Sequence, residues 1–567
     1  MLVALVVSLL VAVVSFLYGR AALVLFARAI DAPGESLRLP FPIVVLAGLA
    51  VLAALAGTWA LWDGLGATAC CAFLAGAVLI AALRPRWLPE ALRREAAEVG
   101  GAGLLGWLLL AAGVLFVLVR AAGPVDSYDA GTYHAPLIRW LESHGFVPGL
   151  GNLHGRLALS AGWFVPSALF SFAWLGGRSL HVLNGTLLLL LLLWGVTALA
   201  AWRHGERRAS LVLRLLLPLA GLRFLGKWLS SPTPDVAAAV LVWVVGVLAL
   251  ELTESAEGEA GGDDGARAGA LALLAGFAVA VKLSALPLLL LPLFLAVHRL
   301  AARTPRKAAA LAAALALPLA PAVAQSLVTS GYPVFPLSRL DPFDFDWEVP
   351  RAQAEAYVGW IRSWALLPHR PPHEVLAMPF SEWLPRWWEA LRWPFSGAVL
   401  AIVLLAPLRL VLVLIRRPRR PSFESLALHA TVWTGALSWF VIAPAPRFGW
   451  GFVVLLAFLL ALPLVATAAR RLPAAALAAL LLAALAWEVW QVRGWEPAAF
   501  PAAARHALIP ADYPRPATRR VVLGGIPVHL PVENDQCWYE PFPCTPTPDP
   551  KLTPRGRGLA DGFRSTD

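Results

Sequence analysis

Residues 126–156 gather two aspartates, three histidines and a glycine-rich turn in one short stretch. Asp126 and Asp129 are three residues apart, so both carboxylates face the same way if they begin a helix. A carboxylate at a membrane surface can act as a general base towards an acceptor hydroxyl or amine, or it can hold a divalent cation against a phosphate. Asp129 and Asp126 are therefore the candidate catalytic residues, and also the candidate ligands of a Mg²⁺ or Mn²⁺ ion.

Further polar residues stand in the same loop or at the ends of apolar stretches. Lysine is scarce, with four residues in the chain, so Lys282 between two apolar stretches is informative. Lys282 and Arg447 could clamp a phosphate, which needs charge-assisted donors. The candidate substrate-binding residues are Lys282, Arg447, His134, Asn152, His154, Arg156, Asp235 and Tyr332.

Ordinary structural roles compete with these assignments. Asp235 follows Pro234 and could simply cap a helix. Lys282 could extend its ammonium to the membrane surface without a ligand. His134 and His154 fit histidines of the membrane interface better than metal ligands.

The composition is that of a polytopic membrane protein. The chain has 567 residues, of which 59% are hydrophobic and 14% charged, and a mean hydropathy of +0.70. A soluble domain carries roughly a quarter charged residues. The formal net charge of +11 is concentrated in short arginine clusters between apolar spans. Clusters at such positions are typical signals of membrane orientation, so we expect no nucleic-acid partner.

The apolar stretches predict an all-α fold with about 14 transmembrane helices, within a range of roughly 12–16. All the arginine clusters between spans lie on the cytoplasmic side if the apolar stretch 157–175 does not cross the membrane. Loops 123–181 and 330–393 then lie outside, and the chain divides into N-terminal spans 1–100, a membrane domain 101–492 and an outer tail 493–567. We expect spans at about 2–26, 40–62, 66–83, 101–122, 182–201, 210–229, 235–252, 268–281, 283–298, 307–329, 394–416, 424–443, 448–469 and 473–492.

Three smaller predictions concern the outer segments. A short amphipathic helix from Tyr133 to about His144 is expected to lie on the bilayer surface through side chains such as Trp140. In the tail, Cys537 and Cys544 enclose WYEPFP and are expected to form a disulfide in an oxidising compartment. The tail also contains RRVVLGGIPVHL, which is typical of one strand pair with a turn at its two glycines.

The order of several motifs resembles the type-C glycosyltransferase superfamily, whose members use polyprenyl-phosphate donors. The motifs DSYDAGTYH, VPGLGNLHGR, SPTPD, TSGYPVFP, PAPRFG and CWYEPFPC resemble, more closely, an uncharacterised bacterial membrane-protein family within or beside it. The resemblance runs over most of residues 100–545. It implies that Asp129, with Asp126 beside it, occupies the catalytic first-loop position, and that Lys282 and Arg447 lie near the carrier phosphate.

The sequence departs from the better-known enzymes in two ways: it has no adjacent acidic pair, and it has three additional N-terminal spans. The departures leave the metal and the donor open. The expected function is transfer of a sugar or related group from a polyprenyl-phosphate donor to an outer glycan, lipid or protein acceptor. The expected place is the bacterial cytoplasmic membrane, with the site facing outward.

Other classes of protein remain compatible with the residues. They are a transporter or lipid flippase, a polysaccharide polymerase or ligase, and a non-catalytic subunit of an envelope complex. Transporters usually carry charges near the bilayer midplane and show inverted repeats, whereas the charges here are expected at the outer ends of spans.

Overall fold

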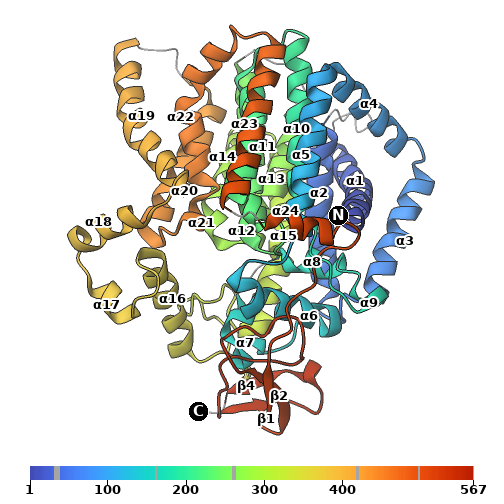
Figure 1. Cartoon of the computed structure of the whole chain (residues 1–567), viewed down its shortest axis with the longest axis vertical. Coiled ribbons are helices and arrows are strands. Elements are labelled where there is room, and N and C mark those ends of the chain that lie inside the picture. The colour runs from blue at the N-terminus through green and yellow to red at the C-terminus, as the bar shows by residue number, and fades with distance from the viewer. Residues whose placement is uncertain (31–38, 160–161, 258–263, 417–420, 496–497, 566–567) are drawn as a thin grey trace.

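A bundle of long apolar helices forms the bulk of the molecule in a computed structural model, which describes residues 1–30, 39–159, 162–257, 264–416, 421–495 and 498–565 (Figure 1). Within these ranges, 13 helices are long and apolar enough to cross a membrane, so the predicted polytopic all-α fold is confirmed. They are α1 Leu2–Ala29, α2 Phe41–Trp59, α5 Gly103–Ala122, α10 Leu183–Arg203, α11 Ala209–Ala220 continued by η4 Gly221–Leu225 and η5 Gly226–Trp228, α12 Pro234–Ala256, α13 Asp264–Val281, η6 Leu283–Leu289 continued by α14 Leu290–Ala301, α15 Pro305–Ser330, α19 Phe395–Arg416, α20 Phe423–Ile442, α22 Phe452–Ala469 and α23 Ala474–Trp495.

A bent pair of helices supplies a further potential span. Helices α3 (Ala67–Leu83) and α4 (Trp87–Gly101) meet at an angle of 84°. The bend falls between Arg84, which follows α3, and Trp87, which begins α4. If the pair crosses as one unit, the total becomes 14.

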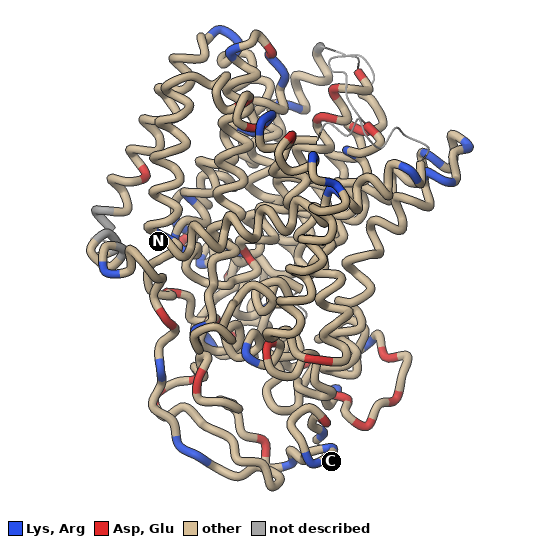
Figure 2. Tube along the Cα trace, turned by 90° about the vertical axis from the view of Figure 1, so that its right-hand side faces the viewer, with Lys and Arg blue, Asp and Glu red and all other residues tan. Residues whose placement is uncertain are grey.

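One end of the bundle collects arginine clusters that are distant in sequence. Arg203 Nη1 donates to the carbonyl of Gly101 at 2.9 Å, and Arg470 Nε donates to the carbonyl of Arg207 at 3.1 Å. Basic segments also gather at the top of the trace in Figure 2. We call this side the arginine end.

The opposite side, which we call the loop end, is formed by the first loop, the second loop and the tail. Asn152 Nδ2 in the first loop donates to the carbonyl of Trp347 in the second at 2.9 Å. The tail joins them through Trp538, whose N–H donates to the carbonyl of Gly131 at 2.8 Å. The three segments therefore share one side of the bundle, as the sequence predicted (Figure 1).

Residues 157–175 form no helix of membrane-spanning length. They are built from the 3₁₀ turn η3 (Gly155–Ala158) and the short helices α8 (Phe164–Leu169) and α9 (Ala173–Gly176), with residues 160–161 outside the described ranges. A span needs about 20 residues. The chain therefore returns to the bundle through α10 from the same side.

The predicted helix of the first loop is present, but its expected position on the bilayer surface is wrong. Helix α6 (Ala135–His144) ends at Gly145, which has a φ of 70°. Trp140 is only 1% exposed because its ring packs against Phe542 and Phe563 of the tail at 4.6 and 5.8 Å. Protein rather than lipid covers the apolar face of α6, since the tail folds over it.

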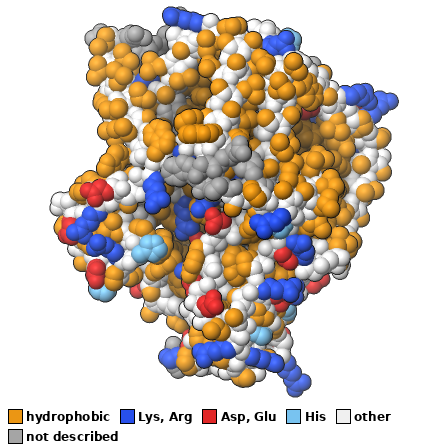
Figure 3. Space-filling view, viewed as in Figure 1, with side chains coloured by type: hydrophobic (Ala, Val, Ile, Leu, Met, Phe, Trp, Pro, Cys, Tyr) orange, Lys and Arg blue, Asp and Glu red, His pale blue; other side chains and the backbone are white. Residues whose placement is uncertain are grey.

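The second loop carries three helices that stand away from the bundle axis. They are α16 (Arg351–Leu366), α17 (Pro372–Ala377) and α18 (Phe380–Ala390), and they form a lateral arm in Figure 1. In Figure 3 hydrophobic side chains cover much of the upper part of this face. Charged side chains line its lower part, and the surface is hollowed beside the arm.

The tail is a small β-containing unit. Strands β1 (Thr518–Leu523) and β2 (Ile526–Pro531) pair in antiparallel fashion around Gly524 and Gly525, as predicted. The expected disulfide between Cys537 and Cys544 is also confirmed. The sequence did not indicate helix α24 (Ala499–Arg505) or the second strand pair, β3 (Leu552–Pro554) with β4 (Phe563–Ser565).

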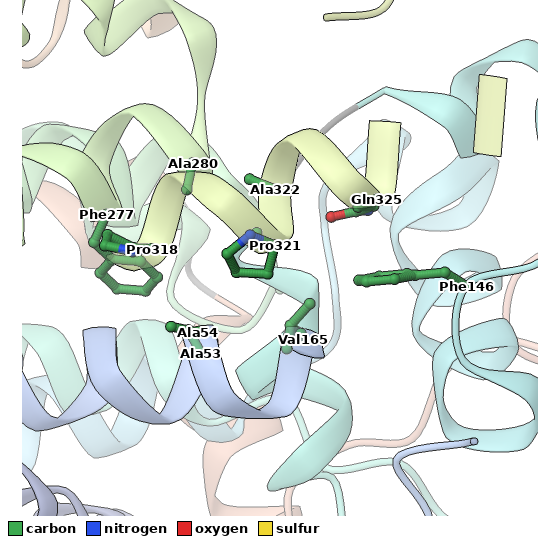
Figure 4. Close-up of a pocket in the computed structure, with 12 residues that line it drawn as sticks. Ala53, Ala54, Phe146, Val165, Phe277, Ala280, Pro318, Pro321, Ala322 and Gln325 are labelled. Atoms are coloured by element: carbon green, nitrogen blue, oxygen red, sulfur yellow. The ribbon is translucent and has the colours of Figure 1, made fainter. Parts of the chain in front are cut away.

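Close helix contacts support the bundle where small residues face one another. A side chain on Gly48 of α2 would place its Cβ 1.6 Å from the carbonyl oxygen of Ser15 in α1. Between α2 and α15, Pro318 and Pro321 leave a small apolar pocket with Gln325 at its margin (Figure 4). None of the residues that line this pocket bears a charge.

Candidate functional site

Asp129 and Arg447 form an ion pair at the loop end, although they are 318 residues apart in sequence. Asp129 follows α5 and precedes the π-helical turn η2 (Ala130–His134). Arg447 lies in α21 (Pro446–Gly449), a short helix between α20 and α22. Their side chains are 15% and 27% exposed, so the pair is partly shielded from water and its attraction is stronger than on an open surface.

A second guanidinium approaches the same aspartate. Arg156 Nη1 lies 3.9 Å from Oδ1 of Asp129 and 4.0 Å from Oδ2 of Asp535 in the tail. The Arg156 guanidinium also lies over the ring of Trp360, 4.5 Å from its centroid. The Tyr128 hydroxyl donates a hydrogen bond to the Asp535 carboxylate. Thus the first loop, the arm and the tail all contact Arg156.

Lys282 and Asp235 form the second buried ion pair. Lys282 ends α13 in extended backbone, with φ −159° and ψ 129°. Asp235 lies in the first turn of α12, and its other carboxylate oxygen accepts a hydrogen bond from the Thr233 hydroxyl at 3.2 Å. The ring of Phe448 adjoins both pairs, because its centroid lies 4.1 Å from Lys282 Nζ and 5.2 Å from Cζ of Arg447.

These ion pairs make up what we call the charged cluster, with three carboxylates and three cations: Asp129, Asp235, Asp535, Arg447, Lys282 and Arg156. Two of its members, Asp235 and Arg447, border a small pocket. The pocket is lined by Asp235, Ala238, Ala239, Val242, Ser284, Ala285, Arg447, Phe448, Gly451 and Phe452.

The formal charges of the cluster balance, and this limits its chemistry. An incoming anion meets cations that already have carboxylate partners. It must therefore draw a cation away from its partner, and the released carboxylate becomes available for another role. The arrangement can bind a phosphate and expose a base in one movement.

The surroundings of Asp129 keep its carboxylate ionised. Burial alone would raise the pKa of Asp129, but the positive charge of Arg447, with a smaller contribution from Arg156, holds that pKa below its usual value. Burial lowers the pKa of the neighbouring His134 to about 4, so its imidazole is neutral at pH 7. His134 packs edge-on against Tyr133, with the ring centroids 4.4 Å apart.

Asp126 lies apart from the charged cluster. Its side chain is 64% exposed and pairs with Lys227 at 3.0 Å. The expectation that both aspartates share a helix face fails because residues 124–127 are not helical. Both oxygens of Asp129 face guanidinium groups, and the described residues contain no group of three or more His, Cys, Asp or Glu that could hold a metal. The residues present therefore do not fit a divalent cation.

Three other candidates are buried and take no part in the ion pairs, and two of them link segments of the outer loops. Tyr332 is fully buried and its hydroxyl donates to the carbonyl of Val349 at 2.9 Å. Asn152 is 4% exposed and links the two outer loops through Trp347. His154 is also 4% exposed, and burial lowers its pKa to about 3. These contacts are structural in character.

Sequence reasoning missed Asp535, Tyr128 and Phe448. Asp535 stands two residues before Cys537, in a tail expected to be peripheral. Its contact with Arg156 bridges most of the chain length, so no local pattern indicates it. Phe448 directly follows Arg447 in the PRFG motif, and this position next to a predicted site residue could have indicated Phe448.

A family model described as "Domain of unknown function (DUF8201)" matches residues 1–454. No curated protein and no solved structure matches the chain. The match ends shortly after Arg447 and before the tail that supplies Asp535.

Proposed function

The chain belongs to the DUF8201 family, whose description names no activity, and we propose from the charged cluster that it is a membrane glycosyltransferase. It would transfer a sugar or related group from a polyprenyl-phosphate donor to an extracytoplasmic acceptor, with the loop end facing the exterior of a bacterial cytoplasmic membrane. The observation that carries this proposal is the meeting of Asp129, Arg447 and Lys282 at one end of a membrane bundle.

Arg447 and Lys282 would bind the donor phosphate. Both cations lie close to the same ring, that of Phe448, with Lys282 Nζ 4.1 Å and Arg447 Cζ 5.2 Å from its centroid. A phosphate at the membrane surface loses water on binding, and charge-assisted hydrogen bonds compensate for that loss. The apolar helices around the pocket would accommodate the isoprenoid part of the donor.

Asp129 would be the general base. When phosphate draws Arg447 away, the carboxylate is free to take a proton from an acceptor hydroxyl or amine. The acceptor atom then forms a bond to the anomeric carbon, and the bond from that carbon to the phosphate oxygen breaks. The electron pair of the broken bond leaves with the polyprenyl phosphate.

The test uses purified full-length protein in lipid nanodiscs. Binding is measured with a polyprenyl phosphate, and transfer is measured as release of polyprenyl phosphate from synthetic polyprenyl-phosphate hexoses and pentoses, with membrane extract as the acceptor source. Asp129→Asn should lower transfer by roughly 10²- to 10⁴-fold and keep donor binding. Lys282→Met should weaken binding roughly ten- to a hundredfold.

Two controls lie at the same end of the bundle. Lys227→Met removes a lysine from an exposed ion pair and should leave binding unchanged. Asp126→Asn should be much milder than Asp129→Asn, because Asp126 lies outside the cluster. Polyprenyl phosphate binding without release from any donor would contradict the transferase proposal and favour a lipid flippase.

A further inference from the structure

The tail is hydrogen-bonded to the residue immediately before Asp129. The side-chain amide of Gln536 donates through Nε2 to the carbonyl of Tyr128 at 2.9 Å. The hydroxyl of Tyr128 in turn donates to the carboxylate of Asp535. Two consecutive tail residues thus hold both the backbone and the side chain of the residue next to Asp129.

The tail also holds the backbone immediately after Asp129. The Trp538 N–H donates to the carbonyl of Gly131 at 2.8 Å, and a Cβ on Gly131 would lie 2.6 Å from the Trp538 ring. The absence of a side chain at Gly131 therefore permits this approach. Trp538 lies within the segment closed by the disulfide between Cys537 and Cys544. The disulfide limits the conformations that this segment can adopt.

Arg156 connects the tail to the catalytic carboxylate. A single nitrogen, Nη1, lies 3.9 Å from Asp129 and 4.0 Å from Asp535, while the ring of Trp360 supports the guanidinium. The side chain of Arg156 is 14% exposed, so it is largely shielded from water. Without the Asp535 charge, Arg156 would be attracted to Asp129 alone.

We propose that tail residues 535–544 are a positioning element of the active site, in which Asp535 holds Arg156 midway between two carboxylates and so keeps Asp129 available as a base. The effect on transfer rests on the proposed function. The effect on the geometry of the first loop does not, and the two can be measured separately.

The first experiment is Asp535→Asn in the full chain, which keeps the shape and removes the charge. Arg156 should then move onto Asp129, so transfer at saturating donor should fall roughly 10- to 100-fold, while the donor KM is unchanged because Arg447 and Lys282 are intact. The acid limb of the pH profile should move to lower pH, since Arg156 further favours ionised Asp129. Asp535→Glu should restore part of the rate.

Asp512→Asn is the matched control. Asp512 also lies in the tail, is similarly exposed at 41% against 38% for Asp535, and pairs with Arg178 at 3.4 Å away from the cluster. It should leave both rate and pH profile unchanged. Equal effects of Asp512→Asn and Asp535→Asn would overturn the positioning role.

Hydrogen exchange gives a readout that needs no activity. Amides of residues 126–135 should exchange faster in Asp535→Asn and in the double variant Cys537→Ser/Cys544→Ser, and at the wild-type rate in Asp512→Asn. If both tail variants keep wild-type exchange there, the positioning proposal is wrong. If wild-type protein consumes no donor while exchange responds as expected, the transferase function fails and the positioning by the tail stands.

Discussion

At the scale of single residues, the main feature is that each cation of the site already has a carboxylate partner. Lys282 could have extended to the membrane surface, but it lies against Asp235. Arg447 could have stood alone at a helix end, but it lies against Asp129. Removing the carboxylate of such a pair leaves the cation uncompensated, so the folded protein should become less stable while anion binding becomes stronger.

Asp235→Asn tests this directly. The variant releases Lys282 from its only carboxylate partner among the described contacts, so polyprenyl phosphate should bind about tenfold more tightly. The unliganded variant should unfold at a lower temperature than wild type, because the Lys282 charge is then unpaired in a buried place. Both quantities come from thermal unfolding with and without the ligand. Weaker binding in the variant would show that Asp235 orients Lys282 rather than competing with the ligand.

His154 should make stability fall with acid. Its pKa is about 3 in the folded protein and about 6.5 when exposed. Between these two values the unfolded state therefore binds a proton on His154 and the folded state does not. The contribution of His154 to the free energy of unfolding should be on the order of 2 kcal/mol lower at pH 5 than at pH 7. His154→Gln should lack this loss, as measured by thermal unfolding across that range. Parallel curves for both proteins would contradict burial of His154.

At the scale of elements, short irregular segments between regular spans place the reactive groups. The spans themselves were predicted to within a few residues, because long apolar runs determine them locally. The π-helical turn Ala130–His134 and the short helix Pro446–Gly449 were not predicted, since their shapes depend on partners distant in sequence. Placing α6 on the bilayer failed for the same reason: an apolar face predicts burial, but not whether lipid or the tail covers it.

Helices α1 and α2 depend on a glycine contact. Gly48→Ala would place a methyl group against the Ser15 carbonyl oxygen, so the helices must separate, at a cost of about 1–3 kcal/mol. The melting temperature should fall. Gly100→Ala is the control, because nothing lies within 4 Å of a Cβ there and the helix should tolerate or favour alanine. Equal melting temperatures for the two variants would mean that α1 and α2 are not packed this closely.

At the scale of the whole molecule, the arginine clusters that lie between the spans indicate an orientation. Arginine clusters meet at one end, and the three large polar segments meet at the other. The amino group of Met1 donates to the carbonyl of His506 at 2.7 Å, so the first residue also lies at the loop end. The positive-inside rule then predicts that the charged cluster lies outside the cytoplasm.

Single cysteines at positions 178 and 205 report this orientation, in a background where Cys70 and Cys71 are replaced by serine. A membrane-impermeant maleimide applied to intact cells should label position 178 and should reach position 205 only after the membrane is opened. Position 178 lies just before α10 and position 205 just after it. Labelling of both positions in intact cells would mean that α10 does not cross.

The contacts that the tail makes with the neighbours of Asp129 also imply an order of events during biosynthesis. Ribosomes make the chain from its first residue onward, so the loop that carries Asp129 is made long before Arg447, and Asp535 is made later still. A nascent chain that already contains most of its spans therefore has Asp129 without Arg447, and a first loop without the tail that covers it. In the proposed transferase, the site would be complete only once the tail has been made, so a chain that stops before the tail could insert into the membrane and remain inactive.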